Sequence, residues 1–312
     1  MSEKVSTRQG FGKGISALAR KRNDIVITAA DTYRSFAMAD LVKEFSDRFF
    51  EFGIAEQNMM AASAGMAAEG KTVFTVGYSP FMSMRALEQM RTFIAYPNLN
   101  VKVVAGLSGL SGDTDGVTHQ GTEDIALVRA IPNFTVICPA DAVSAEKFVE
   151  LAANIDSPVY LRIGRGATPV IYGEDAIFEV GKAYKARAYG NDFTVISTGL
   201  CVTEAVKAAD ELKEQGINIR VLDMHTVKPI DEQAIIVAAK ETGGILTVED
   251  GTICGGLGGA VAEVLADNGL GIKFSRLGLS RFGTAGNVPD LLQFFGLDSN
   301  AIYKRVKKIL NK

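Results

Sequence analysis

Histidine and cysteine are scarce in this chain, which has two histidines, His119 and His225, and three cysteines. Cys138, Cys201 and Cys254 are far apart and form no CxxC or Cys/His pattern, so the sequence predicts neither a structural zinc site nor a disulfide framework. A metal site built from several histidines is excluded within the chain. A catalytic histidine has to be one of the two. A reducing compartment, the cytoplasm, is the expected location.

Long apolar runs and an excess of one charge are also lacking. The formal net charge is −3, which argues against nucleic acid or an anionic membrane surface as a partner. No apolar run reaches the roughly 18 residues of a membrane span. The N-terminal segment has no apolar core of the kind found in signal peptides. No GxxxxGK(S/T) or GxSxG sequence occurs, so a P-loop NTPase and a nucleophile-elbow hydrolase are excluded.

What the sequence does contain is a regular alternation of strands and helices. Short, almost wholly apolar runs predict buried strands over 24–30, 72–78, 100–107, 134–140 and 158–164. Helical patterns separate them over about 55–68, 80–95, 121–130 and 142–154, the last preceded by Asp141 as a candidate N-cap. Such alternation is typical of a doubly wound parallel sheet covered on both faces.

The alternation weakens over 165–190 and then resumes, which predicts two α/β domains. We expect domains over 1–172 and 191–312, with a linker over 173–190 that contains at most one edge strand. Strands are predicted over 193–199, 217–225, 243–251 and 273–280 in the second domain. The glycines of 248–265 lack the strict GxGxxG spacing, so close helix–strand packing is favoured over dinucleotide binding. The basic amphipathic C-terminal segment is expected to pack its apolar face on this domain.

Ligands of open α/β sheets bind beyond the carboxyl ends of the strands, and several polar side chains follow predicted strands here. The loop 108–121 carries four glycines, Asp113, Asp115 and His119. It is either a ligand-binding loop or an ordinary surface loop. Glu56 begins an otherwise apolar helix, where the helix dipole favours its ionised form. Taken alone, Glu56 could have only that structural role.

Several motifs taken together resemble the pyrimidine-binding domain of transketolases, which use thiamine diphosphate. They are GIAEQNM (53–59), YSPFMSMRALEQMR (78–91), GDTDGVTHQGTEDIALVRAIPN (112–133) and LRIGRG (161–166). The remainder resembles the transketolase C-terminal domain, including FGTAGNVPDLLQFFGL (282–297). The resemblance covers essentially the whole chain. It implies two three-layer α/β domains with parallel sheets and a two-carbon ketol transfer from a ketose, with or without a phosphate, to an aldose.

The resemblance also implies roles for individual residues. Glu56 would hydrogen-bond the pyrimidine nitrogen of the cofactor, where a carboxylate is needed because that nitrogen must be held protonated. Phe81 resembles the aromatic residue that stacks on the pyrimidine, although it could also be a core residue. Asp31 matches an aspartate near the cofactor. Asp115 and His119 match contacts to the substrate hydroxyls, and His119 could share proton transfer at the sugar oxygens.

Three further positions match sugar-phosphate contacts: Arg8, Ser35 and Arg165. Two guanidiniums and a hydroxyl suit a phosphate dianion. The chain departs from the family at Leu107, where transketolases usually carry a phosphate-contacting histidine. Leucine cannot donate a hydrogen bond, so a branched, deoxy or sulfonated sugar, or weaker phosphate binding, is also compatible with the sequence.

The G-D-G…N motif that holds the cofactor's diphosphate and Mg²⁺ in full-length transketolases is missing. The chain therefore resembles the C-terminal subunit of a split transketolase. This implies an N-terminal subunit on a separate polypeptide that supplies the Mg²⁺ ligands, an α2β2 heterotetramer and no activity alone. The alternatives are a 1-deoxyxylulose-phosphate synthase-like enzyme or the β-subunit of a 2-oxo acid dehydrogenase. A relative that has lost activity is disfavoured because Glu56 is retained.

Overall fold

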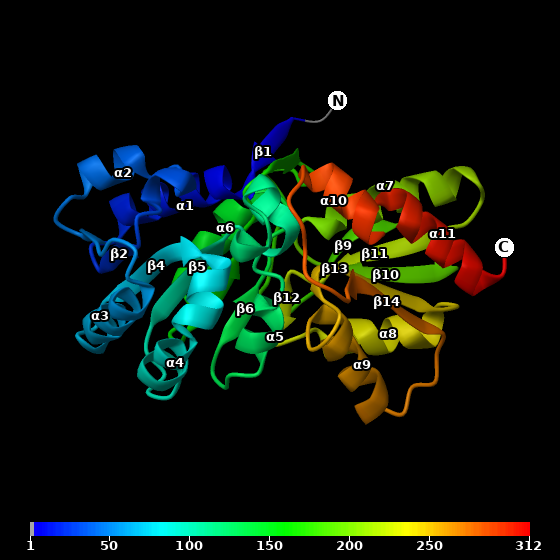
Figure 1. Cartoon of the computed structure of the whole chain (residues 1–312). Coiled ribbons are helices and arrows are strands. Elements are labelled where there is room, and N and C mark those ends of the chain that lie inside the picture. The colour runs from blue at the N-terminus through cyan, green and yellow to red at the C-terminus, as the bar shows by residue number, and fades with distance from the viewer. Residues whose placement is uncertain (1–2) are drawn as a thin grey trace.

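The computed structural model describes residues 3–312, which form two α/β units lying side by side (Figure 1). The N-terminal unit contains a seven-stranded sheet in the order β12-β6-β7-β5-β4-β2-β3. All described pairs in it are parallel except β12 with β6. Its strands are β2 (Ile25–Ala29), β3 (Phe49–Glu51), β4 (Thr72–Tyr78), β5 (Val101–Gly106), β6 (Thr135–Ile137), β7 (Val159–Arg162) and β12 (Thr226–Lys228).

Helices cover both faces of this sheet and produce the predicted three layers. On one face α1 and α6 bury their side chains Phe11 and Phe148, and on the other face α3 buries Met59 and Met60. The predicted N-cap Asp141 accepts a hydrogen bond from the Ser144 backbone N–H. The helices are α1 (Thr7–Lys21), α2 (Ala39–Glu44), α3 (Glu56–Ala68), α4 (Leu87–Gln89), α5 (Asp124–Arg129) and α6 (Ala142–Ala153).

Helix α1 is not predicted from the sequence, because glycines at 10, 12 and 14 lower helix propensity. Its fold depends on tertiary packing. A Cβ added to Gly10 would lie 2.1 Å from the Ala142 carbonyl oxygen, and one added to Gly14 would lie 2.7 Å from that of Glu146. The glycines therefore let α1 pack directly against the backbone of α6.

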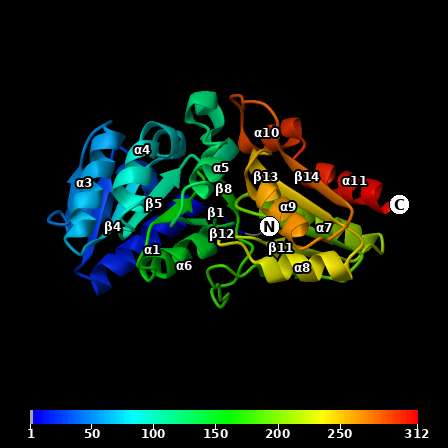
Figure 2. The same cartoon turned by 90° about the horizontal axis from the view of Figure 1, so that it is seen from below.

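The C-terminal unit contains a five-stranded sheet in the order β14-β13-β10-β11-β9. Helices α7 and α11 pack together, and α8 and α9 form a second packed pair that is seen in front of the sheet in Figure 2. The predicted C-terminal helix is α11, which buries Ile302 and Val306. The elements are β9 (Tyr184–Ala188), β10 (Phe193–Ser197), α7 (Cys201–Glu214), β11 (Ile219–Asp223), α8 (Glu232–Glu241), β13 (Ile245–Thr252), α9 (Leu257–Asp267), β14 (Phe274–Leu279), α10 (Val288–Phe295) and α11 (Ser299–Leu310).

The two units are joined by more than the linker. Strand β12 follows β11 in the chain but pairs with β6 in the N-terminal sheet. Just before it, His225 is buried between the rings of Phe148 and Phe178, with centroids 4.7 and 5.7 Å away. The segment that connects the two units includes two strands. Strand β8 (Ala167–Pro169) pairs with β1 (Lys4–Ser6), and the edge strand β9 pairs antiparallel with β11. Among residues 3–312, no helix has the length and apolar character needed to span a membrane.

Candidate active site

Glu56 is the first residue of α3, and its carboxylate is buried, with 2% of the residue exposed. The Arg85 guanidinium donates a hydrogen bond of 2.6 Å from Nη1 to Glu56 Oε2. Arg85 comes from a π-helical turn, Phe81–Arg85, that lies against α3. A polar group removed from water is costly unless it has such a hydrogen-bonding partner.

The π-helical turn also places Phe81 in the same cluster. The Arg85 guanidinium lies over the Phe81 ring at 4.4 Å from its centroid. The sequence predicts one continuous helix over 80–95, whereas the structure contains π-helical turns at Phe81–Arg85 and Met90–Ala95 with α4 between them. The wider turn changes which side chains share a face, and such turns are frequent at functional sites.

His119 brings the glycine-rich loop to this cluster. Its ring meets that of Phe81 edge-on at 5.2 Å, and the Tyr78 ring lies 6.2 Å away. The Tyr78 hydroxyl is in turn 2.8 Å from Ser35 Oγ. Two residues to which the sequence pattern assigns no role, Arg85 and Tyr78, thus connect four of the candidates. These candidates are Glu56, Phe81, His119 and Ser35.

A second group contains Arg8, Asp115 and Arg165. Arg8 Nη2 donates to the backbone carbonyl of Arg165 at 3.1 Å, and Arg165 Nη1 donates to Asp115 Oδ2 at 2.5 Å. Partial burial, and then the neighbouring Arg165, lower the pKa of the Arg8 guanidinium. The three side chains carry one net positive charge, which favours an anionic group beside them.

Asp31 and Leu107 have different surroundings from these groups. Asp31 is exposed after β2, and its backbone N–H donates to Glu51 Oε1 at 2.7 Å. Within residues 3–312 its carboxylate makes no hydrogen bond with the other candidates. Leu107 has φ +57° and is only 1% exposed, so its side chain belongs to the core beneath the loop.

Comparison with known proteins identifies the family. The transketolase pyrimidine-binding domain model matches residues 3–170, and the transketolase C-terminal domain model matches residues 181–302. This chain belongs to the transketolase family. A putative transketolase C-terminal section of Methanocaldococcus jannaschii is 45% identical and covers 98% of this chain and 96% of that protein.

Two further transketolase relatives also align along nearly their whole length. One subunit of the apulose-4-phosphate transketolase of Phocaeicola vulgatus is 37% identical over 99% of this chain and 98% of that protein. A solved structure described as a split gene transketolase, inactive beta4 tetramer, superposes with a TM-score of 0.90 at 36% identity, covering 99% of both chains. The chain is therefore a transketolase-family subunit, and its domain types imply dependence on thiamine diphosphate.

In this transketolase subunit the C-terminal domain supports the loop that carries Asp115 and His119. Gln120 Nε2 donates to the Thr284 carbonyl at 2.8 Å, and the Thr252 backbone N–H donates to the Thr122 carbonyl at 2.7 Å. The motif over 282–297 thus includes a segment that holds the loop from the other domain.

The sequence pattern does not single out two arginines, Arg85 and Arg162, because their roles depend on tertiary contacts. Arg85 follows Phe81 by four residues, a spacing that could have suggested a shared helix face. Arg162 lies inside the LRIGRG motif, yet its position between Asp124 and Asp250 depends on both domains. Within residues 3–312, no group of three or more His, Cys, Asp or Glu side chains could hold a metal ion.

Proposed function

We propose that this chain is the C-terminal subunit of a heteromeric transketolase that transfers a two-carbon ketol unit from a ketose to an aldose with thiamine diphosphate. The observation that carries the proposal is the buried Glu56 carboxylate. It is paired with Arg85 and lies in one connected cluster with Phe81 and His119. A buried carboxylate beside an aromatic ring fits a heteroaromatic base that must be held protonated.

The residues present fit the pyrimidine half of the cofactor, which supplies a nucleophilic carbon when bound. Glu56 would accept a hydrogen bond from the protonated ring nitrogen, and its carboxylate charge would favour that proton. Arg85 would balance the charge of Glu56 and fix its orientation. Phe81, only partly buried, would contact the ring. The role of Asp31 near the cofactor stays a prediction, since its carboxylate bonds to none of these residues.

The substrate would be bound by the loop and by the arginine group. Arg8, Arg165 and Ser35 would hold the phosphate or another anionic end of the sugar. Asp115 and His119 would contact its hydroxyls, and His119 could move a proton at a sugar oxygen. Because the side chain at position 107 is buried and apolar, it offers no hydrogen bond to the anionic end. The arginines would therefore provide most of that recognition.

The Mg²⁺ ion and the diphosphate would be held by a separate N-terminal subunit in an α2β2 assembly. The relatives named as a transketolase C-terminal section and as a transketolase subunit, covered over 96% and 98% of their own length, support this division. The split gene relative, an inactive beta4 tetramer, is consistent with a chain that needs its partner for activity.

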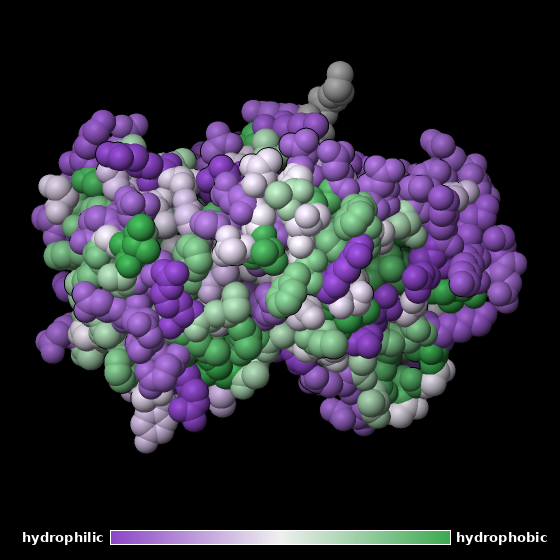
Figure 3. Space-filling model, in the orientation of Figure 1, coloured by the Kyte–Doolittle hydropathy of each residue, from purple (hydrophilic) through white to green (hydrophobic). Residues whose placement is uncertain are grey.

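Apolar side chains around Glu56 also support a partner. Ile54 is 73% exposed and Tyr96 is 85% exposed, and Phe50, Met84 and Phe93 are exposed as well. Ile54 precedes α3, and Met84 and Phe93 lie within the two π-helical turns that pack against α3. Figure 3 shows apolar surface, mixed with hydrophilic residues, in the lower part of the N-terminal half beside α4. An exposed apolar area of this kind is typical of a protein interface.

The test is reconstitution with the N-terminal subunit, thiamine diphosphate and Mg²⁺, followed by assay of two-carbon transfer from a panel of ketoses with and without phosphate. We expect transfer by the complex and none by either chain alone. Glu56→Gln should lower kcat by about a thousandfold or more, because an uncharged amide cannot stabilise the protonated ring. Glu211→Gln, an exposed position on α7 of the C-terminal domain, is the matched control. No transfer from any ketose by a folded complex would overturn the proposal.

A further inference from the structure

A buried serine and a buried aspartate connect the turn that carries Phe81 to the loop that carries His119. Ser79 lies between β4 and the π-helical turn, just before Phe81. Asp124 is the first residue of α5, just after the loop 108–121. The Ser79 hydroxyl donates to Asp124 Oδ2 at 2.8 Å, and both residues are fully buried. One hydrogen bond therefore joins the two segments on which these candidate active-site residues lie.

The end of the loop lies directly against this serine. A Cβ added to Gly121 would lie 2.1 Å from Ser79 Oγ, so a larger residue has no room there. On its other side, the Ser79 backbone carbonyl accepts a hydrogen bond from Ser83 Oγ at 2.7 Å, within the π-helical turn. A shift of Ser79 would therefore move the turn and the loop relative to each other.

Three further residues hold the Asp124 carboxylate in place. Arg162 Nε donates to Asp124 Oδ2 at 2.9 Å, and the Tyr160 hydroxyl donates to the same oxygen at 3.2 Å. Burial, and then the nearby Asp124, raise the pKa of the Tyr160 hydroxyl well above its usual value, so it keeps its proton as a donor. Arg162 Nη1 donates to Asp250 Oδ1 of the C-terminal domain at 2.7 Å. A fully connected buried network of this kind fixes the orientation of its members.

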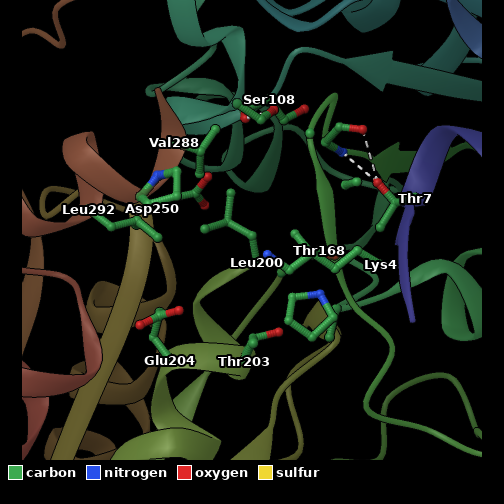
Figure 4. A pocket seen from close by; sticks show the side chains of 18 of the residues that line it. Lys4, Thr7, Ser108, Thr168, Leu200, Thr203, Glu204, Asp250, Val288 and Leu292 are labelled. Atoms are coloured by element: carbon green, nitrogen blue, oxygen red, sulfur yellow. Dashed lines mark hydrogen bonds between the residues drawn. The ribbon is translucent and has the colours of Figure 1, made fainter. Parts of the chain in front are cut away.

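The start of the loop is anchored at the same place as its end. The Gly109 backbone N–H donates to the Gly121 carbonyl at 2.7 Å. A Cβ added to Gly109 would lie 1.9 Å from Asp250 Oδ2, so the loop packs directly on that carboxylate. Figure 4 shows Ser108 and Asp250 at the border of a cavity of about 500 Å³ between the domains. Both ends of the loop therefore rest on the network around Asp124.

The geometry that depends on this network is the contact between Phe81 and His119. Their rings meet edge-on at 5.2 Å, with 77° between the planes. An edge-on aromatic contact is weak, so the two rings depend on their backbones for their spacing. Within residues 3–312, the bond between Ser79 and Asp124 is the one hydrogen bond that connects residues 79–91 to residues 108–124.

We propose that Ser79 and Asp124 are positioning residues that set the distance between Phe81, on the cofactor side, and His119, on the substrate side. This rests on the proposed function, which defines the two sides. Both positioning residues are fully buried and act through Phe81 and His119. Without their hydrogen bond the turn and the loop shift apart, and a displacement of about 1 Å can lower a reaction rate about a hundredfold.

The kinetic test is a double-mutant cycle in the reconstituted enzyme. Ser79→Ala should lower kcat/KM about tenfold, because the bond to Asp124 is lost. If Ser79 acts through His119, adding Ser79→Ala to His119→Ala should cost less than about threefold more. Ser197→Ala, a fully buried serine that donates to the Val248 carbonyl at 3.0 Å, is the matched control and should leave kcat/KM unchanged. A further loss of about tenfold in the His119→Ala background would contradict the proposal.

A structural test needs no catalysis, because this chain contains two histidines. With ¹³C-labelled histidine the ring signals of His119 and His225 can be followed by NMR in the full chain, and His225→Phe assigns them. Ser79→Ala should move the His119 signal, since the neighbouring Phe81 ring shifts, and leave the His225 signal in place. Tyr160→Phe, which removes the hydroxyl but keeps the ring, should act in the same direction.

The two tests separate this proposal from the proposed function. An unmoved His119 signal in both folded variants would overturn the positioning role of Ser79, whatever the activity. If the His119 signal moves but the folded complex transfers no ketol unit, the positioning contact stands and the proposed function falls.

Discussion

Arg85 links the carboxylate of Glu56 to the ring of Phe81, and its side chain is partly exposed while that of Glu56 is buried. The interaction is therefore asymmetric. Loss of Glu56 leaves a cation that water can still solvate, whereas loss of Arg85 leaves a buried carboxylate without a counter-charge. Leaving a buried charge without its partner is costly, because water no longer solvates it.

Arg85→Gln should therefore lower the activity of the reconstituted enzyme, because the buried carboxylate loses both its counter-charge and the hydrogen bond that orients it. We expect about a tenfold loss of kcat/KM. Arg85→Lys retains the charge and should recover much of the activity. Measurement of kcat and kcat/KM for the three proteins checks this. Equal activity of Arg85→Gln and the unchanged protein would contradict the positioning role.

His225 provides a separate prediction at the residue scale. Burial lowers the pKa of its imidazole to about 4, while the unfolded chain is protonated below about pH 6.5. The unfolded state therefore binds the extra proton between these values. The His225 imidazole is neutral in both the folded and the unfolded state above about pH 6.5. The free energy of unfolding therefore declines as pH falls from there toward 4, by at most on the order of 3 kcal/mol.

Replacing His225 with phenylalanine should remove this part of the acid destabilisation, because Phe148 and Phe178 already form an aromatic environment there. Urea unfolding of both proteins at a series of pH values gives the comparison, since all other groups contribute equally to each curve. We expect the two stability curves to diverge below about pH 6.5. Parallel curves down to pH 4 would show that His225 does not titrate as expected.

At the scale of elements, the loop 108–121 depends on the C-terminal domain. A Cβ added to Gly283 would lie 2.0 Å from Gln120 Oε1, so Gly283→Ala should displace the buried Gln120 side chain and its bond to the Thr284 carbonyl. We expect KM for the sugar substrate to rise about tenfold as Asp115 and His119 shift, with a smaller effect on kcat. Gly271→Ala has no neighbour within 4 Å and is the matched control. Equal steady-state kinetics of the two variants would contradict the role of this contact.

Elements also show what the sequence pattern could and could not predict. The buried strands were predictable because strands covered on both faces are apolar throughout, as β4 and β5 are. Helix α1 was not predictable, because its glycines lower the local preference for a helix. They are needed there because only glycine lets α1 pack directly against the backbone of α6. The π-helical turn that brings Arg85 to Glu56 was not predictable either, since its apolar pattern is that of an ordinary helix.

At the scale of the whole molecule, the exposed apolar side chains around Glu56 predict a partner interface. Ile54→Asp and Tyr96→Asp place charges on that face and should weaken assembly with the N-terminal subunit by about tenfold or more. The thermal stability of the chain itself should change little because both side chains are exposed. Ile177→Asp, at a position that is 85% exposed elsewhere, is the control. Sedimentation of the mixed subunits measures the effect, and unchanged assembly would place the interface on another surface.

The sequence alone determined the family resemblance, the two α/β domains and the candidate residues, because these depend on local pattern and on motifs in order along the chain. Only the tertiary structure decided which candidates meet. It joins Glu56 to Phe81 through Arg85 and leaves Asp31 apart from them. It also brings Asp124, Arg162 and Asp250 together from two domains. Such contacts depend on packing between distant segments, and ion pairs between distant segments leave no periodic signal in a single sequence.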